Sequence, residues 1–314
     1  MQKRNLAQKF KVAEALADPT DDKLNRATLA EELGSTLANF VGKESLVVGV
    51  YSSWGDGKTT FVNFVLNQVN KQYKAPETPL IIKFNPWQFS NHSDLAQQFL
   101  KQLATSLLVS DRGAEAKKIG EKLLAIVPLF NALKFIPEPF VQIGSYALTQ
   151  SFKTVGTAAK AIGDGFSKDL ETIKMDVSKA LGELPYSIFV VIDDMDRLQD
   201  TEIKLMFQLI KSVCNFKNTI YLLPMDIEVV STALSSSYQG NGRAFLEKII
   251  QVPIHLPKIT SSTLETLINT ELESLFPERS IELKKQSSQE ILRTGFYSNF
   301  KISVILKDSS TFYY

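Results

Sequence analysis

One segment, residues 46–67, constrains the fold of this chain more than any other. An apolar run, Leu46–Tyr51, leads into a glycine-containing loop that ends with the letters GKTT at Gly57–Thr60, and residues with helical apolar periodicity follow directly. This order predicts a strand, a loop and a helix, which is the setting that a phosphate-binding loop requires. The segment therefore predicts an α/β fold that binds a nucleoside triphosphate.

Each residue type in this loop suits phosphate chemistry. Gly55 and Gly57 allow the backbone to turn so that its N–H groups face phosphate oxygens, and the helix N-terminus adds a partial positive charge. The Lys58 ammonium can reach the β- and γ-phosphates, and the Thr59 hydroxyl can ligate Mg²⁺. The predicted nucleotide-binding residues are Ser53, Trp54, Gly55, Asp56, Gly57, Lys58, Thr59 and Thr60.

The loop departs from the usual pattern at one position. The pattern G-x-x-x-x-G-K-[ST] places its first glycine five residues before Gly57, where this chain has Ser52. A turn out of a strand favours a residue without a Cβ there, so we expect Ser52 to be accommodated with modest strain and to weaken nucleotide binding or turnover. An incidental glycine-rich turn is the alternative interpretation of the segment.

A second motif, Ile188–Ile192 followed by Asp193 and Asp194, supports the first. Its continuous run of β-branched and aromatic residues predicts a strand covered on both faces. Carboxylates at the end of such a strand lie beside the crevice where open α/β sheets bind ligands. We predict that Asp193 holds Mg²⁺ through water and that Asp194 orients or deprotonates the attacking water. An acidic helix N-cap after a strand is the alternative.

The two motifs resemble the Walker A and Walker B motifs of the KAP family of P-loop NTPases. The residues that carry the resemblance are SSWGDGKTT at Ser52–Thr60 and IDDMDR at Ile192–Arg197. Three further blocks, at Asp21–Arg26, Lys83–Trp87 and Ala244–Pro253, are similar to family segments and occur in the family's order.

This resemblance covers roughly residues 21–257. It implies a RecA-like, STAND-type ATPase core with ATP and Mg²⁺ as ligands, and a role at a membrane or in prokaryotic defence. Met195 stands where the family usually has leucine, which is a volume-conserving replacement. The Arg-bearing helical region with which the family continues is not recognisable after Pro257, so we expect only a partial helical lid, beginning with a helix at 262–276.

Composition favours an intracellular enzyme. Lysine and arginine number 35 and aspartate and glutamate 34, so net charge does not indicate a nucleic-acid partner. Cys214 is the only cysteine, which favours a reducing compartment. Residues 1–10 contain no apolar core of a secretory signal. We expect a cytoplasmic location, with peripheral association to the inner face of the membrane as a further hypothesis.

The order of expected elements indicates a doubly wound parallel sheet. Strands are expected at 46–51, 80–84, 188–192, 219–224 and 251–256, and helices at 11–39 with a break at Pro19, 60–73, 94–109, 200–216 and 227–234. The expected domains are an N-terminal helical segment (1–45), a P-loop NTPase core (46–109 and 186–257), a helical insertion between Walker A and Walker B (110–185) and a partial C-terminal helical lid (258–314).

The insertion is long, because Lys58 and Asp193 lie far apart in sequence while a minimal core needs only one or two βα units between such motifs. Residues 123–148 are strongly apolar, but prolines and charged residues interrupt any stretch of about 20 residues that could span a membrane. We predict a helical hairpin within residues 122–168 that docks on a protein partner or a membrane surface. Packing on the core and a true membrane span are the alternatives.

Several side chains near the motifs admit two interpretations. Arg197 either reaches the γ-phosphate of a neighbouring subunit, which would imply a homo-oligomer, or forms an ion pair with an adjacent aspartate. Asp226 either senses nucleotide or caps the helix that follows it. Trp54 either packs on adenine or a partner, or is buried against the sheet edge. Trp87 is expected in the core.

Together these observations predict an ATP-binding protein whose hydrolysis of ATP drives or resets a conformational or assembly switch. The alternative is a nucleotide-gated scaffold or membrane-docking module with little or no hydrolysis, which the serine in the loop and the short lid favour. The predicted catalytic residues are Asp194, Lys58 and Arg197, and the predicted metal ligands are Thr59 and Asp193.

Overall fold

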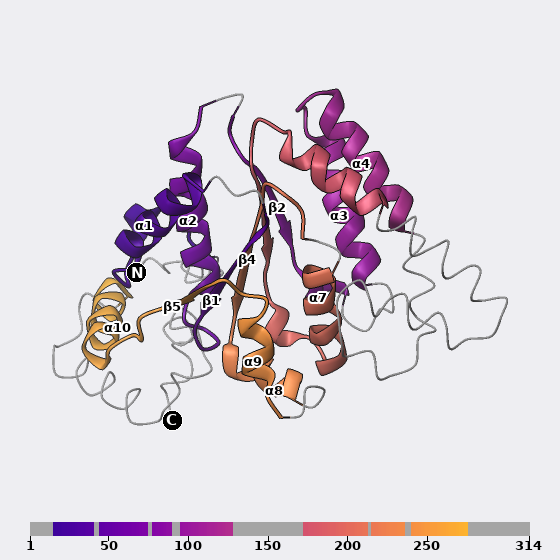
Figure 1. The fold of residues 1–314 in the computed structure, drawn as a ribbon. Coiled ribbons are helices and arrows are strands. Elements are labelled where there is room, and N and C mark those ends of the chain that lie inside the picture. Colours follow the sequence, from indigo (N-terminus) through magenta and orange to yellow (C-terminus); the bar gives the residue numbers. More distant parts are fainter. Residues whose placement is uncertain are drawn as a thin grey trace, which may run out of the picture. The chain divides into compact units, whose positions relative to one another are not determined.

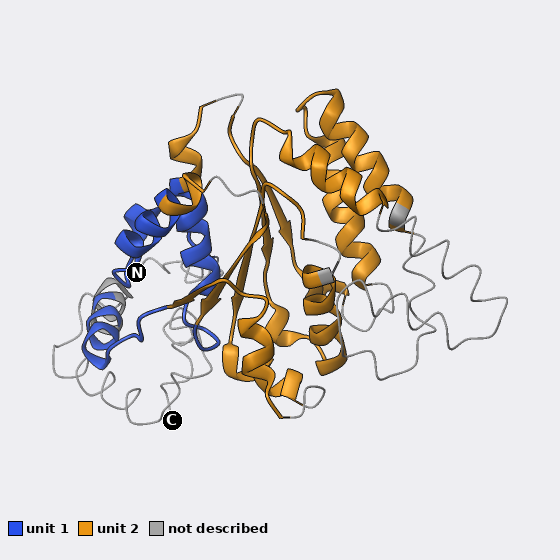
Figure 2. Cartoon of the chain, viewed as in Figure 1, with its two compact units in different colours: residues 1–35, 52–68, 256–314 blue, residues 36–51, 69–255 orange. Residues whose placement is uncertain are grey.

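The computed structural model describes residues 15–40, 44–74, 77–89, 95–127, 172–212, 215–235 and 240–275 of the 314-residue chain. Within these limits the chain forms two compact units (Figure 2). Unit 1 comprises the described parts of residues 1–35, 52–68 and 256–314, and unit 2 comprises the described parts of residues 36–51 and 69–255. Each unit is therefore assembled from segments that are distant in sequence.

Unit 2 contains a five-stranded parallel sheet with the order β2-β3-β4-β1-β5 (Figure 1). The strands are β1 (Leu46–Tyr51), β2 (Leu80–Phe84), β3 (Ile188–Ile192), β4 (Thr219–Met225) and β5 (Val252–His255). The chain crosses from β1 to the edge strand β2 and then returns through β3 and β4 to β5 on the other edge. Connections between parallel strands are right-handed as a rule, so the two directions place helices on opposite faces of the sheet, which is the doubly wound arrangement. The predicted fold class and all five predicted strands are confirmed.

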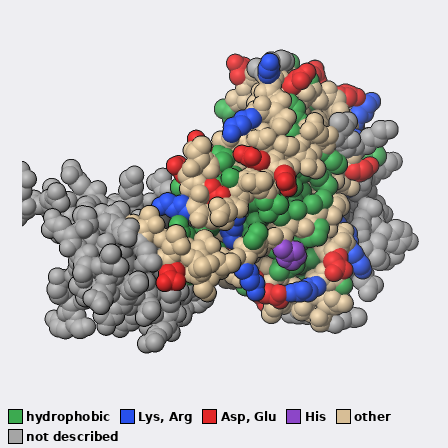
Figure 3. Space-filling model, turned by 90° about the vertical axis from the view of Figure 1, so that its left-hand side faces the viewer, with side chains coloured by type: hydrophobic (Ala, Val, Ile, Leu, Met, Phe, Trp, Pro, Cys, Tyr) green, Lys and Arg blue, Asp and Glu red, His purple; other side chains and the backbone are tan. Residues whose placement is uncertain are grey.

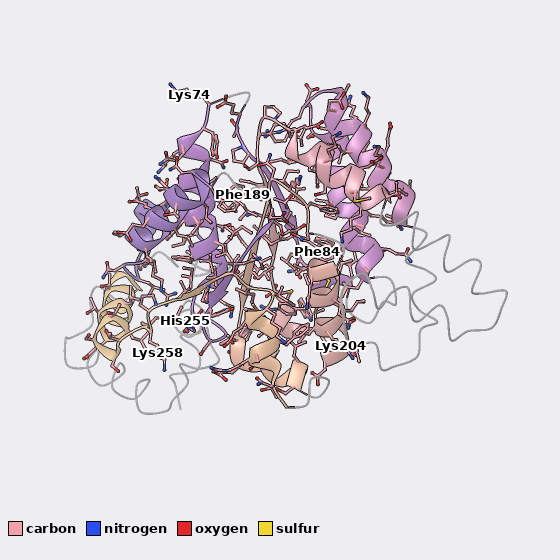
Figure 4. All side chains as sticks on the ribbon, in the orientation of Figure 1. Lys74, Phe84, Phe189, Lys204, His255 and Lys258 are labelled. Atoms are coloured by element: carbon pink, nitrogen blue, oxygen red, sulfur yellow. The ribbon has the colours of Figure 1, made fainter. Side chains whose placement is uncertain are left out.

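Burial explains why these segments form strands. Every residue of β3 and β4 is buried, as expected for central strands rich in valine, isoleucine and leucine. The edge strands are more accessible: β2 includes half-buried residues and one exposed residue, and β5 alternates half-buried with exposed residues. Figure 4 labels Phe189 of β3 and Phe84 at the end of β2. Phe189 is completely buried, and the Phe84 ring meets that of Phe99 edge to face, with ring centroids 5.1 Å apart. The buried strand β4 pairs with β3 on one side and with β1 on the other, so it fixes these two strands at the middle of the sheet.

The helices of unit 2 flank this sheet (Figure 1). They are α3 (Leu95–Val109), α4 (Ala114–Ile126), α7 (Asp200–Ser212), α8 (Ile227–Ser235), α9 (Gly242–Glu247) and an unlabelled helix at residues 172–182. Ala116, Ile119 and Leu123 of α4 are essentially inaccessible to solvent. For this first part of the insertion, packing on the core is the interpretation that the structure supports. The apolar stretch at 128–148 lies outside the described residues.

Unit 1 contains the start of α1 (Ala27–Ala38), most of α2 (Lys58–Gln72) and α10 (Ser261–Leu275), which confirms the first lid helix. The helix expected from residue 11 instead begins at Ala27 in the described chain. The Asp22 carboxylate accepts hydrogen bonds from the backbone N–H groups of Leu24, Arg26 and Ala27 at 2.9, 2.6 and 2.8 Å. An aspartate that binds its own downstream backbone favours a turn and a helix start over a helix interior.

No helix in the described segments is both long and apolar enough to cross a membrane. On the face drawn in Figure 3, acidic and basic side chains are interspersed among apolar ones. This mixture agrees with a formal net charge of +1 for the whole sequence.

Candidate functional site

The loop between β1 and α2 has the backbone shape that its glycines predict. Gly55 and Gly57 have φ angles of +88° and +82°, in the region that side chains of L-residues rarely adopt. The Asp56 carboxylate accepts from the Ser53 N–H at 3.1 Å, and the Asp56 N–H donates to the Ser53 carbonyl at 3.3 Å. The loop therefore closes on itself through its own polar groups.

Ser52 does not have the conformation that the sequence suggested. Among the described residues, the only non-glycine residues with positive φ are Asn25, Asp194 and Asn218, so Ser52 lies outside the left-handed region. Left-handed backbone strain, which would favour glycine here, is therefore absent at Ser52. The effect of this serine on nucleotide binding and turnover stays a prediction. Its hydroxyl oxygen is buried and finds no hydrogen-bond partner among the described residues.

Lys58 is the first residue of α2, and its side chain folds back over the loop. It is 8% exposed, and its ammonium donates to the carbonyl oxygens of Ser52 and Ser53 at 3.1 and 3.3 Å. A cation at this place, beside the first N–H groups of a helix, makes a strongly favourable environment for an anion. The backbone and the lysine together therefore have the geometry of a phosphate-binding loop.

The other predicted residues of the loop occupy different environments. Trp54 is 49% exposed, so it is not buried against the sheet edge. Thr59 is exposed at the start of α2, where its hydroxyl is the kind of hard oxygen ligand that suits Mg²⁺. The hydroxyl of Thr60 instead accepts a hydrogen bond from the N–H of Leu16 at 3.2 Å, which connects α2 to the chain before α1.

Arg26 contacts this loop from the N-terminal segment, and sequence reasoning gave it no role in the site. Its guanidinium donates through Nη1 to the carbonyl oxygen of Asp56 and through Nη2 to that of Pro257, the latter at 2.7 Å. Burial lowers the pKa of Arg26, while the carboxylates of Asp56 and Asp22 oppose that shift. The one sequence feature that points to Arg26 is the block Asp21–Arg26, which resembles a segment of the family. That resemblance does not indicate what the arginine does.

The second group of predicted residues lies in unit 2, at the carboxyl end of β3. The Asp193 N–H donates to the Phe84 carbonyl at 3.1 Å and so continues the pairing of β3 with β2. The next residue, Asp194, turns away with φ 61° and ψ 27°, and its N–H donates to the Asp193 carboxylate at 2.9 Å. The ladder between β3 and β4 has already ended at the pair Val191 and Leu222, which leaves this end of β3 room to turn.

Both carboxylate oxygens of Asp194 are engaged by neighbouring side chains. Asn85 donates to one oxygen from Nδ2, and Arg197 donates to the other from Nε, each at 2.8 Å. Of the two interpretations of Arg197, the structure has the ion pair. The Arg197 guanidinium also lies 5.0 Å from the centroid of the Trp87 ring, a cation–π contact. Trp87 is 50% exposed, so its predicted place in the core is wrong.

Two further groups complete the polar end of the sheet. The Asp196 carboxylate accepts from the Asp226 N–H at 2.9 Å and thereby joins the segment after β3 to the end of β4. The Asp226 side chain accepts from the Glu228 N–H at 3.0 Å, so it caps α8, as one of the two interpretations expected. Within the described chain, no group of three or more His, Cys, Asp or Glu side chains could hold a metal ion by itself.

The structure thus gathers the predicted residues into two sets. Ser53–Thr60 lie together in unit 1, and Asp193, Asp194 and Arg197 lie together in unit 2. β1 and β3 run parallel in the same sheet with β4 between them, so the strand that precedes the loop and the strand that precedes the aspartates end at the same edge of that sheet. This is the edge at which open α/β sheets bind their ligands.

Comparisons with known proteins agree with this geometry. The model of the KAP family P-loop domain matches residues 26–311. A phage T7 exclusion protein of Escherichia coli strain K12 is 23% identical over an alignment of 282 residues, and the alignment covers 84% of this chain and 37% of that protein. The chain therefore spans little more than a third of the length of this relative.

Two solved structures show a weaker likeness. The ORC2 protein of Aeropyrum pernix, in ADPNP–ADP complexes, has a TM-score of 0.39 at 12% identity over 86% of this chain and 55% of its own. Cdc6p of Pyrobaculum aerophilum has a TM-score of 0.41 at 15% identity over 81% and 50% of the two chains. The family match extends over most of the sequence and includes both motifs, and the chain belongs to the KAP family of P-loop NTPases.

Proposed function

We propose that this protein binds ATP through the loop at 52–60 and hydrolyses it to drive or reset a conformational or assembly switch. Membership of the KAP family supports nucleotide binding. The main structural support is the conformation of the loop. Gly55 and Gly57 have left-handed φ angles, and the nearly buried Lys58 is the first residue of α2. Such a loop presents backbone N–H groups and one ammonium to phosphate oxygens.

The proposed chemistry divides between the two sets of residues. Lys58 would hold the β- and γ-phosphates, Thr59 and Asp193 would supply oxygen ligands for Mg²⁺, and Asp194 would orient or deprotonate the attacking water. Bound Mg²⁺ would neutralise charge on the phosphates. This assignment rests on the family motifs and on the chemistry of each group.

The first test concerns binding. Replacing Lys58 with alanine removes the ammonium that lies over the loop, so we expect ATP affinity, measured by titration calorimetry, to fall by at least roughly tenfold, about 1.4 kcal/mol. Lys71 is an exposed cation in the last turn of the same helix and provides a matched control, because Lys71→Ala should leave ATP affinity unchanged. Equal affinity in Lys58→Ala and the wild type would refute the phosphate-binding role.

A second candidate function, nucleotide-gated binding with little or no hydrolysis, is favoured by a specific observation. The carboxylate that we propose as the catalytic base already accepts hydrogen bonds from Asn85 and Arg197 on its two oxygens. A base in this state is less available to a water molecule, so turnover would require that at least one of these contacts is released. Single-turnover ATP hydrolysis by the wild type distinguishes the two functions.

If the protein hydrolyses ATP, replacing Asp194 with asparagine should lower the single-turnover rate by roughly 10²-fold or more, the scale of losing a general base, and preserve ATP affinity. Asp193→Asn is the matched variant, since the same chemical change one residue earlier should mainly weaken the dependence on Mg²⁺. A wild-type rate in Asp194→Asn would remove it from the catalytic role. A wild type that binds ATP without turnover would favour the second function.

The wider setting of this activity is also a proposal. The similarity to a phage exclusion protein supports a role in prokaryotic defence. The switch would be an ATP-dependent homo-oligomer, or docking on a protein or on the inner face of the membrane by the part of residues 122–168 that follows α4. Phage should form fewer plaques on cells that express the wild type than on cells that express Lys58→Ala. Equal plaque numbers would argue against a nucleotide-dependent defence role of this chain.

A further inference from the structure

Arg26 is a charged side chain that the proposed chemistry does not use, yet it is only 3% exposed. Its two terminal nitrogens donate to two backbone carbonyl groups, that of Asp56 in the phosphate loop and that of Pro257 beyond β5. The partners lie 30 and 231 positions away in sequence, and all three residues belong to unit 1. One guanidinium therefore joins three distant parts of the chain.

This arrangement depends on the shape and charge of arginine. Moving a cation out of water is unfavourable unless hydrogen bonds replace its hydration. The planar guanidinium stays charged and presents several N–H donors in fixed directions, so it can serve two acceptors at once. The backbone before α1 is fixed as well, because the N–H of Arg26 itself donates to the Asp22 carboxylate at 2.6 Å.

The contact with Asp56 determines how the phosphate loop presents a donor. A trans peptide is planar, and its C=O and N–H groups point in opposite directions. Because the Asp56 carbonyl points toward Arg26, the N–H of Gly57 in the same peptide points away from Arg26. Gly57, with φ +82°, is the residue before Lys58, and its N–H is one of the donors that a phosphate loop offers.

The contact with Pro257 reaches the C-terminal helical segment. Pro257 is followed after three residues by α10, Ser261–Leu275, whose start is capped by Thr260. The Thr260 hydroxyl accepts from the N–H of Thr263 at 3.2 Å. The guanidinium that fixes the loop peptide thus also holds the chain that leads into α10.

We propose that Arg26 is a positioning residue that couples the phosphate loop to the segment carrying α10, so that occupancy of the loop by nucleotide and the stability of α10 depend on each other. This inference rests on the proposed binding of ATP. Coupling of this kind is reciprocal, because a contact that favours the binding-competent loop also favours the segment on its other side.

The first experiment compares Arg26→Lys with a matched variant. A single ammonium cannot reproduce the two directed contacts of the guanidinium, so we expect the affinity of the intact chain for MgATP, measured by calorimetry, to fall at least roughly tenfold. Arg112 in unit 2 also donates to two backbone carbonyls, those of Thr78 and Pro79, neither of which belongs to the phosphate loop. Arg112→Lys should therefore retain the wild-type affinity.

The second experiment measures coupling, which a merely structural role would not produce. In the wild type and in Arg112→Lys, MgATP should slow hydrogen exchange of the amides in Ser261–Leu275, and in Arg26→Lys this protection should be lost. Wild-type affinity in Arg26→Lys overturns the inference and leaves the proposed function intact. Absence of ATP-dependent protection in the wild type also overturns it, without recourse to a variant. A wild type that binds no ATP overturns both.

Discussion

Asp194 has a backbone conformation that few residues other than glycine, asparagine and aspartate adopt, with φ 61° and ψ 27°. Such a conformation costs roughly 1 kcal/mol and persists where surrounding contacts compensate for it. Here the side chain of Asn85 and the ion pair with Arg197 provide that compensation. The residue proposed as the catalytic base is therefore held in one defined position by backbone and side-chain contacts together.

The buried hydroxyl of Ser52 leads to a prediction about the stability of the fold. Its hydroxyl is buried without a partner among the described residues, and its φ is not positive. Ser52→Ala removes the unpaired hydroxyl and keeps the Cβ, so we expect the free energy of unfolding, measured in urea, to rise by up to about 1 kcal/mol. Ser52→Gly should be less stable than Ser52→Ala by roughly 0.5–1 kcal/mol, because glycine increases the entropy of the unfolded chain.

Neither Ser52 variant should bind ATP more tightly, because the native turn does not need a left-handed residue at this position. Calorimetric titration of both variants checks this. A clear gain in affinity for Ser52→Gly alone would mean that the serine does constrain the loop and that the expectation from the sequence pattern was sound.

Which residues could be predicted depended on whether their partners were close in sequence. The glycine and lysine positions of the loop follow from a local pattern, and the Asp226 cap involves a residue only two positions away. Trp87 could not be placed, because the arginine that lies over its ring is more than a hundred positions away. Arg26 was missed for the same reason, since no local signal connects it to Pro257.

At the scale of elements, the apolar runs were sufficient to locate the strands. Three of the five, β1, β2 and β3, have the bounds that the sequence predicted, because buried parallel strands combine a continuous apolar run with flanking turn residues. Helix α4 was assigned to the insertion, since its sequence alone does not tell a helix packed on the core from one that faces a partner. The start of α1 was displaced by the turn at Asp22.

The close packing of α4 on α3 predicts that a larger residue at Gly120 destabilises the fold. A Cβ on Gly120 would lie 2.8 Å from the Ala104 carbonyl oxygen and 2.6 Å from Cγ of Leu108. Gly120→Ala should therefore lower the free energy of unfolding by about 1–3 kcal/mol, even though alanine is the better helix former. Glu121→Ala, an exposed change one residue later, should have little effect in the same urea titration. Greater stability in Gly120→Ala would mean that the two helices can separate at no cost.

For the whole molecule, stability should depend on alkaline pH through Tyr51. This side chain at the end of β1 is 5% exposed, and burial together with the charge of Glu247 raises its pKa to about 12 from 10.0. The raised pKa means that folding favours the neutral phenol. Its contribution is complete below about pH 10, the unfolded value, and is lost as pH rises toward 12.

We expect the free energy of unfolding to fall between pH 10 and pH 12, with no more than about 2.7 kcal/mol of the fall attributable to Tyr51. Burial raises the pKa of Tyr73 and Tyr186 in the same direction, so the fall should be reduced but not abolished in Tyr51→Phe. Denaturant titrations of both proteins across this range measure the difference. Superimposable profiles would show that Tyr51 titrates alike in the folded and unfolded chains.

The hydrogen bond from Arg26 to Pro257 has a consequence for the order of events during synthesis. Ribosomes add roughly 5–20 residues per second, so the 231 positions between the two residues correspond to roughly ten to fifty seconds of translation. For most of that interval the phosphate loop has already been made, because Asp56 follows Arg26 by only 30 positions, but the Pro257 carbonyl does not yet exist. Contacts between such distant residues also form late in refolding, because closing a long loop is entropically unfavourable. The loop that we propose to bind nucleotide is thus synthesised early, but the contact that joins Arg26 to Pro257 forms only late in synthesis or refolding.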